Sequence, residues 1–123
     1  MFGDGEIALR DIAWSVDGGG PRVLRLRLSW EATSRVTADY HVFVHVVRAK
    51  EGRLLTQSDG VPMYDRYPFS QFRLGEAVAD AYDVAIPDGL PLEDVEVRLG
   101  IYDFATQRRL PVGGADSIVM SLR

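Results

Sequence analysis

The chain has 123 residues, of which 46% are hydrophobic and 26% charged, a balance that excludes an intrinsically disordered or fibrous protein. Its net charge of −4 offers no basic surface to nucleic acid or to an anionic membrane, and the lack of cysteine excludes disulfides, thiolate zinc sites and a cysteine nucleophile. No apolar run approaches the ~20 residues that cross a bilayer, and the first residues do not have the basic head and apolar middle of a secretory signal.

Residues 6–16, EIALRDIAWSV, begin a series of segments in which apolar and polar residues alternate, as they do in strands. The apolar residues of this first segment fall into two sets of opposite phase: Ile7 and Leu9, then Ile12, Trp14 and Val16. A β-bulge or bend near Arg10 and Asp11 would bring both sets to one buried side, or let the strand pass from one sheet to the other.

Residues 23–30, VLRLRLSW, form the clearest predicted strand. Its apolar side consists of Leu24, Leu26, Leu28 and Trp30. Residues 40–47, YHVFVHVV, are apolar on both sides, since Val42, Val44 and Val46 alternate with His41, Phe43 and His45. A strand of this composition is expected to be central and covered on both faces.

Four further segments complete the series: residues 53–59, 76–86, 95–103 and 117–122. In the second of these, the side expected to face the core holds Val78, Tyr82, Val84 and Ile86. Asp80 shares that side, and a buried carboxylate requires a partner. We expect an arginine, either Arg73 or Arg98, to provide it.

Turn residues separate the segments, at Asp17 to Pro21, Glu51-Gly52, Pro87 to Gly89 and Pro111 to Gly114. About seven strands, with turns at roughly 8- to 15-residue intervals and no long amphipathic helix, predict an all-β fold. The expected architecture is an antiparallel two-sheet sandwich of immunoglobulin-like type. An antiparallel barrel is the alternative, and either would form a single domain over residues 1–123.

The two histidines, His41 and His45, are four residues apart, which places them on the same side of a strand but about 13 Å from each other. They cannot share a metal ion there, and no acidic stretch has the oxygen spacing of a calcium loop, so we expect neither a metal nor a cofactor. The sequence contains no glycosidase or serine hydrolase signature. An enzyme would need a deep pocket that joins His45 to Asp59 or Asp80, and we expect the domain not to be an enzyme.

Residues 58–76, SDGVPMYDRYPFSQFRLGE, are rich in aromatic residues but follow neither a strand nor a helix period. Two interpretations are open: a binding surface, or a long crossover whose aromatic rings close one end of the sandwich. We expect Phe69 and Phe72 to point inward and Tyr64 and Tyr67 to be partly exposed to solvent. The candidate ligand-binding residues are Tyr64, Tyr67, His45 and Asp59.

Nearly the whole chain resembles a known family, in segments that include FGDGEIALRDIAW, LRLRLSWEA, QSDGVP, YPFSQFRLGEAVADAYDVAIP and VRLGIYDFATQRRLPV. The most specific pieces are Phe43-Val44-His45, Asp59-Gly60-Val61-Pro62, Tyr67-Pro68, Leu74-Gly75-Glu76 and Gly100-Ile101-Tyr102-Asp103. They resemble the carboxyl-terminal β-sandwich domain of bacterial membrane glycosyltransferases of the dolichyl-phosphate-mannose or arabinose-transferase type. The chain departs from that pattern at Phe69 and Phe72, where the family has threonine and tryptophan.

The resemblance implies a domain outside the cytoplasmic membrane, tethered to it only through a parent chain whose membrane part carries out catalysis. Its partner would be a glycan or a cell-envelope protein, and not nucleic acid. We therefore expect a non-catalytic accessory domain. The alternative is a purely structural or protein-interaction module without a small-molecule ligand, and the oligomeric state stays open.

Overall fold

The computed structural model describes residues 1–3, 5–18 and 21–122 of the chain, so Gly19 and Gly20 of the predicted first turn lie outside the described residues. The strands are β1 (Ile7–Asp17), β2 (Val23–Ala32), β3 (Tyr40–Arg48), β4 (Arg53–Gly60), β5 (Val78–Ala85), β6 (Val95–Asp103) and β7 (Ile118–Ser121). The short helical elements are α1 (Pro62–Asp65) and two 3-10 turns, Phe69–Gln71 and Leu92–Asp94. In the part of the chain that is described, no helix is long and apolar enough to cross a membrane.

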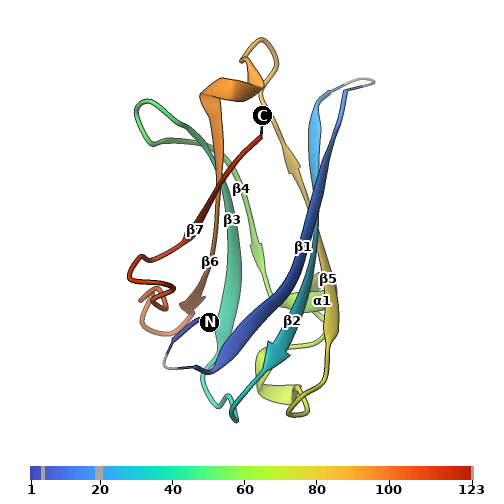
Figure 1. Cartoon of the computed structure of the whole chain (residues 1–123), viewed down its shortest axis with the longest axis vertical. Coiled ribbons are helices and arrows are strands. Elements are labelled where there is room, and N and C mark those ends of the chain that lie inside the picture. The colour runs from blue at the N-terminus through green and yellow to red at the C-terminus, as the bar shows by residue number, and fades with distance from the viewer. Residues whose placement is uncertain (4, 19–20, 123) are drawn as a thin grey trace.

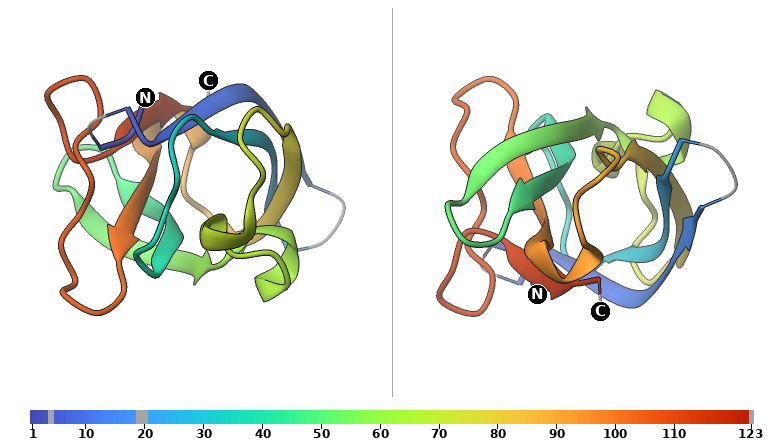
Figure 2. Two further views of the ribbon diagram at one scale, coloured as in Figure 1. Left: turned by 90° about the horizontal axis from the view of Figure 1, so that it is seen from below. Right: turned by 90° about the horizontal axis from the view of Figure 1, so that it is seen from above.

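The strands form two antiparallel sheets that face each other, as Figures 1 and 2 show. One sheet has the order β1-β2-β5 and the other β4-β3-β6-β7. The chain passes between the sheets after β2, after β4 and after β5, so the central strands β2 and β3 belong to opposite layers. The predicted antiparallel sandwich of immunoglobulin-like type is confirmed.

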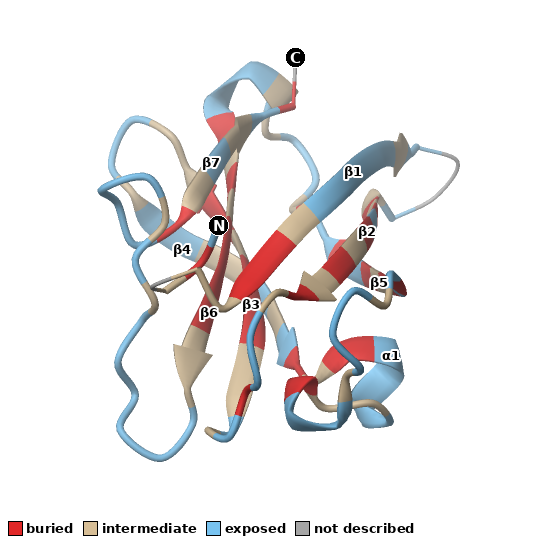
Figure 3. Cartoon of the chain, turned by 60° about the horizontal axis from the view of Figure 1, so that its bottom comes forward, coloured by how far each residue is buried: buried red, intermediate tan, exposed pale blue. Residues whose placement is uncertain are grey.

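The core lies between the sheets, where the alternating side chains of β2 meet those of β3 and β6. The fully buried apolar residues include Leu24, Leu26, Trp30, Val42, Val44, Val46, Val97, Leu99 and Ile101. In Figure 3, red segments mark buried residues along β2, β3 and β6. On β3 the opposite side is different from the expectation: Phe43 is buried, but His41 and His45 are only half-buried, because loop side chains and not a further layer cover them.

The register of β1 shifts between Leu9 and Asp11, which is where the sequence predicted a bulge. The shift pairs Trp14 with the buried Leu26, and β1 stays on β2 along its whole length. Ile12 and Trp14 nevertheless expose 36% and 39% of their surface. β1 is an edge strand, and β7 at the edge of the other sheet has only four residues, so little covers the second half of β1.

The aromatic segment between β4 and β5 is a packed crossover that lies at the lower end of the sandwich in Figure 1. Phe69 is 1% exposed, and its ring meets the edge of the Trp30 ring with 5.6 Å between centroids. Phe72 is half-buried and contacts Phe69 and Tyr67, with 5.0 Å between centroids in each pair. Tyr64 is 75% exposed. The expected inward direction holds fully for Phe69 and in part for Phe72.

Within the crossover, Met63, Tyr64 and Asp65 form a left-handed turn, with φ values of 57°, 57° and 65°. Each non-glycine residue in this region costs roughly 1–2 kcal/mol, so the turn requires support from its surroundings. The amide of Met63 donates to Asp80 Oδ1 at 2.9 Å, and the amide of Val61 donates to Asp65 Oδ1 at 2.7 Å. Two carboxylates therefore hold the turn.

Asp80 is buried, as expected, but the predicted arginine partner was wrong. Its Oδ2 accepts a hydrogen bond from Trp30 Nε1 at 3.0 Å, and its Oδ1 accepts from the amides of Met63 and Ala81, each at 2.9 Å. Polar N–H groups that would otherwise be buried without acceptors thus surround the carboxylate. Asp80 connects the core to the left-handed turn.

Candidate functional site

A hollow of about 240 Å³ opens on the outer side of the four-stranded sheet. We call it the outer-face hollow, and its lining consists of Phe43, His45, Gln57, Asp59, Tyr102, Gln107 and Arg109. Strand alternation explains the first members, because residues 43 and 45 point outward while their neighbours fill the core. The register then places Asp59 of β4 opposite Phe43 and Gln57 opposite His45.

The floor of the hollow depends on a glycine. Gly100 of β6 pairs with Phe43, and a Cβ atom at this position would overlap Cζ and Cε2 of the phenylalanine ring. The ring lies over the glycine and is covered from outside by Arg109, whose Cζ is 4.4 Å from the ring centroid. Arg109 Nη1 also contacts Asp116 Oδ2 at 3.2 Å, which fixes the guanidinium over the ring.

His45 and Asp59 face each other across the hollow, with 3.8 Å between Nε2 and Oδ1. Burial lowers the pKa of His45, and the charges of Arg109 and Arg98 lower it further, while Asp59 opposes them. Burial also raises the pKa of Asp59, against the effect of the two histidines and Arg109. The neutral form of His45 is therefore favoured, and in that form its ring can donate one hydrogen bond and accept one.

Aromatic rings extend the surface beside the hollow. The His41 ring stacks on Phe104 with 4.3 Å between centroids, and Tyr102 lies 5.7 Å from His41. Phe104 is 51% exposed, although it belongs to the loop after β6 and not to a strand. The result is a hydrogen-bonding hollow bordered by a partly exposed aromatic surface.

Two of the four predicted site residues, His45 and Asp59, meet in this hollow. Asp59 also lines a second hollow of about 280 Å³, in which Tyr64 takes part. Tyr67 lies apart from both, because its hydroxyl donates to Glu76 Oε1 at 2.7 Å, a bond that raises the pKa of Tyr67. This hydrogen bond stabilises the crossover by linking Tyr67 to Glu76.

Sequence reasoning missed Gln57, Tyr102, Gln107 and Arg109. Tyr102 could have been found, since it falls in the outward phase of the last long strand and pairs with His41. Gln107 and Arg109 arrive from a loop, whose path no periodicity predicts. Over the described residues, no group of three or more histidine or acidic side chains is placed to hold a metal ion.

The NMR pKa of the His45 ring is expected to lie below 6.5, because burial disfavours its charged form. Asp59→Asn should lower it further, since that change removes a negative charge, and Arg109→Gln should raise it. Arg25→Gln on the other sheet should leave it unchanged. The fold should lose stability as the pH falls from 6.5, because the unfolded chain takes up the proton first. A higher pKa of His45 in Asp59→Asn would contradict the pairing of His45 with Asp59.

No protein-family model matches the chain, and no curated protein does. Among solved structures, the chain is similar to a calcium-binding mutant (D341A, D367A) of β-glucuronidase 2 from Bacteroides uniformis, with a TM-score of 0.54 and 16% sequence identity. The similarity covers 97% of this chain and 13% of the glucuronidase chain, so this chain spans a small part of that protein's length. At this identity the likeness shows the fold, a β-sandwich.

Proposed function

We propose that the chain is a non-catalytic accessory domain of a larger cell-envelope enzyme and binds a glycan in the outer-face hollow. The observation that carries the proposal is the combination of aromatic rings and polar side chains around one open hollow. The parent enzyme in this proposal is a membrane glycosyltransferase, and the domain lies outside the cytoplasmic membrane. The family resemblance of the sequence supports that part.

The chemistry of the lining suits a sugar. A sugar ring has C–H faces that pack on aromatic rings and hydroxyl groups that need both donors and acceptors. The hollow offers the amides of Gln57 and Gln107, the carboxylate of Asp59 and the imidazole of His45. Its volume of about 240 Å³ is below the range typical of drug-sized ligands, which fits one sugar residue.

The lining residues of the outer-face hollow suit the binding of a sugar better than the cleavage of a glycosidic bond. Glycoside hydrolysis generally employs two carboxyl groups on either side of the scissile bond, whereas Asp59 is the one carboxylate among the lining residues. The structure does bring His45 beside Asp59, as an enzyme would require, but the hollow is open to solvent, and its lining residues include no serine, threonine or lysine nucleophile. Asp80 lies in the core and does not reach it.

The similarity to part of a β-glucuronidase is consistent with the proposal, since that name describes a carbohydrate-active enzyme of much greater length. It supports the idea that a sandwich of this shape occurs within larger chains of that kind. The alternative is a protein-interaction module. The exposed Ile12 and Trp14 on the unpaired edge of β1 favour it, because such edges accept further strands.

The test is titration of the ¹⁵N-labelled domain with neutral and acidic mono- and oligosaccharides at millimolar concentrations. We expect at least one sugar to shift the amides of Phe43, His45, Asp59 and Tyr102. Gly100→Ala should abolish those shifts by displacing the Phe43 ring, whereas Gly18→Ala, where an added Cβ meets nothing within 4 Å, should retain them.

Gln57→Ala and Gln107→Ala provide a second measure that does not depend on how well Gly100→Ala folds, and each should weaken binding about tenfold. If no sugar shifts these amides, glycan binding fails as the function. A solution dimer that Trp14→Ala dissociates would then favour the interaction module.

A further inference from the structure

A third hollow, of about 350 Å³, lies beside the left-handed turn, on the far side of the sandwich from Gly100 and the outer-face hollow. We call it the turn hollow, and its lining consists of Arg27, Leu28, Met63, Tyr64, Arg66, Ala79, Asp80 and Ala81. It shares no residue with the outer-face hollow. Of the hollows described so far, it has the most apolar lining.

Strand alternation and register build the base of the turn hollow. Ala79 and Ala81 of β5 point outward, and their small side chains leave space above the sheet. Arg27 of β2 pairs directly with Ala81, so its aliphatic stem borders that space. On the other side α1 packs against β5 and presents Met63 and Tyr64, both of which are exposed.

The two arginines of the turn hollow form no ion pair with any described residue. Among the residues that the structure describes, neither Arg27 nor Arg66 has a side-chain hydrogen bond or ion pair. The nearby acidic groups are engaged elsewhere: Asp80 with Trp30 and Met63, Asp65 with Val61, and Asp83 with Arg25 at 3.2 Å. Two free guanidinium groups therefore border an apolar space.

The left-handed turn keeps this arrangement in place. Asp80 accepts a hydrogen bond from the amide of Met63 in the turn, and Asp65 accepts one from the amide of Val61, which precedes the turn. Met63 and Tyr64 therefore project from a fixed backbone. A site that is already formed loses little conformational entropy when a ligand binds. Strained backbone of this kind is found where surrounding contacts hold a ligand clamp in position.

We propose that the turn hollow binds a small molecule that has an apolar body and one carboxylate. The apolar body lies on Ala79 and Ala81, between Met63 and the Tyr64 ring. The carboxylate is held by Arg27 and Arg66, because the planar guanidinium donates two parallel hydrogen bonds to a carboxylate. The carboxylate of Asp80 keeps its charge, but its oxygens accept hydrogen bonds from Trp30, Met63 and Ala81 and form no ion pair with Arg27 or Arg66.

The experiment uses 3-phenylpropionate as the probe and NMR titration of the ¹⁵N-labelled domain as the measurement. A ligand of this size should bind in the millimolar range and shift the amides of Met63, Tyr64, Ala79 and Ala81. The neutral analogue 3-phenylpropanamide and the short anion acetate separate the two requirements. We expect each to bind about tenfold more weakly than 3-phenylpropionate.

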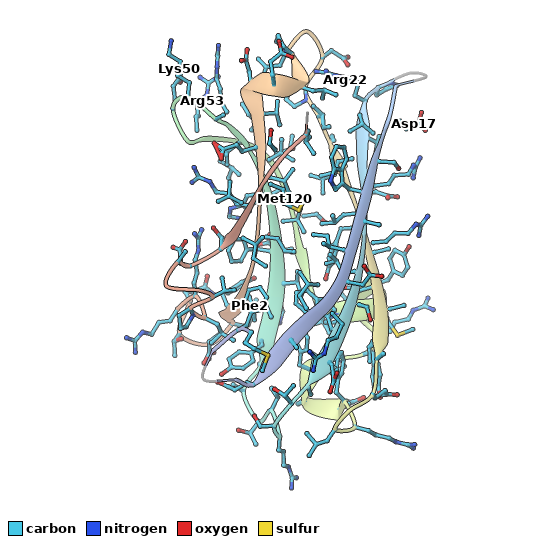
Figure 4. All side chains as sticks on the ribbon, in the orientation of Figure 1. Phe2, Asp17, Arg22, Lys50, Arg53 and Met120 are labelled. Carbon is cyan, nitrogen blue, oxygen red and sulfur yellow. The ribbon has the colours of Figure 1, made fainter. Side chains whose placement is uncertain are left out.

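Three variants locate the site. Arg27→Gln and Arg66→Gln should each weaken binding of 3-phenylpropionate about tenfold, and Ala81→Leu should block it by filling the hollow. Arg53→Gln is the matched control, because Arg53 is exposed at the opposite end of the molecule from α1, as Figure 4 shows, and its loss removes the same charge. It should bind as the parent domain does.

Equal affinity for 3-phenylpropionate and its amide would overturn the proposal. Equal losses of affinity for 3-phenylpropionate in Arg27→Gln and Arg53→Gln would also overturn it. Absence of shifts at saturating millimolar probe would overturn it too. None of these results depends on sugar binding, since the outer-face hollow has no residue in common with this one.

Discussion

Replacing Phe69 with alanine is expected to lower the free energy of unfolding by about 3–4 kcal/mol. The ring is 1% exposed and packs edge-on against Trp30, which Phe2 meets from another side with 5.7 Å between centroids. Truncation leaves a cavity beside the Trp30 and Phe72 rings that cannot close without moving the crossover. Urea unfolding followed by circular dichroism measures the change.

Tyr64→Ala is the matched control for Phe69→Ala, since it removes an aromatic ring from the same crossover but from a position 75% exposed. We expect it to change stability by less than about 0.5 kcal/mol. A loss below about 1 kcal/mol in Phe69→Ala would mean that the crossover does not close the core.

Asp80→Ala is expected to lower the free energy of unfolding by about 3 kcal/mol. Trp30 Nε1 and the Met63 amide lose their acceptor, and Trp30 is fully buried, so water cannot replace it. Asp80→Asn retains one acceptor oxygen and should cost about half as much. Hydrogen exchange at the Met63 amide should also accelerate in Asp80→Ala, because the left-handed turn loses one of its two supports.

The control is Asp83→Ala on the same strand. Asp83 is exposed and forms an ion pair with Arg25 at 3.2 Å, which is expected to contribute less than about 1 kcal/mol. If Asp83→Ala and Asp80→Ala destabilise the domain equally, the buried network around Asp80 is not what holds the turn.

The sandwich could be predicted from sequence because buried and exposed residues alternate along a strand, so that apolar residues recur with a period of two. Leu24, Leu26 and Trp30 follow it without exception, and the phase change in the first segment marks the bulge between Leu9 and Asp11. This alternation indicates on which side of the strand a residue lies, but it does not identify the residues that contact it. It placed Asp80 inside correctly but could not identify a donor that comes from a neighbouring strand and another from a turn.

The candidate site was predictable only in part, for the same reason. His45 and Asp59 were both candidate residues, but it is the register between β3 and β4 that brings them together. One signal was available and unused: Gly100 interrupts an apolar strand, and a glycine in a strand interior often marks the close approach of another group. Here that group is the Phe43 ring.

The left-handed turn could not be predicted, because neither Met63 nor Tyr64 is a residue that favours positive φ. Local preference opposes the conformation, and tertiary contacts with Asp80 overcome it. Both the second hollow and the turn hollow border this turn through Tyr64, so the sequence could name Tyr64 as a candidate without indicating what surrounds it.

The two tryptophans of the chain experience opposite surroundings, since Trp30 is fully buried while Trp14 on the free edge of β1 is 39% exposed. The native emission spectrum is thus the sum of a blue-shifted and a red-shifted fluorophore, and a polar quencher such as acrylamide reaches the second alone. Any molecule that covers the β1 edge will protect Trp14 from quenching and leave Trp30 unaffected. The domain therefore has a built-in optical reporter for association at that edge.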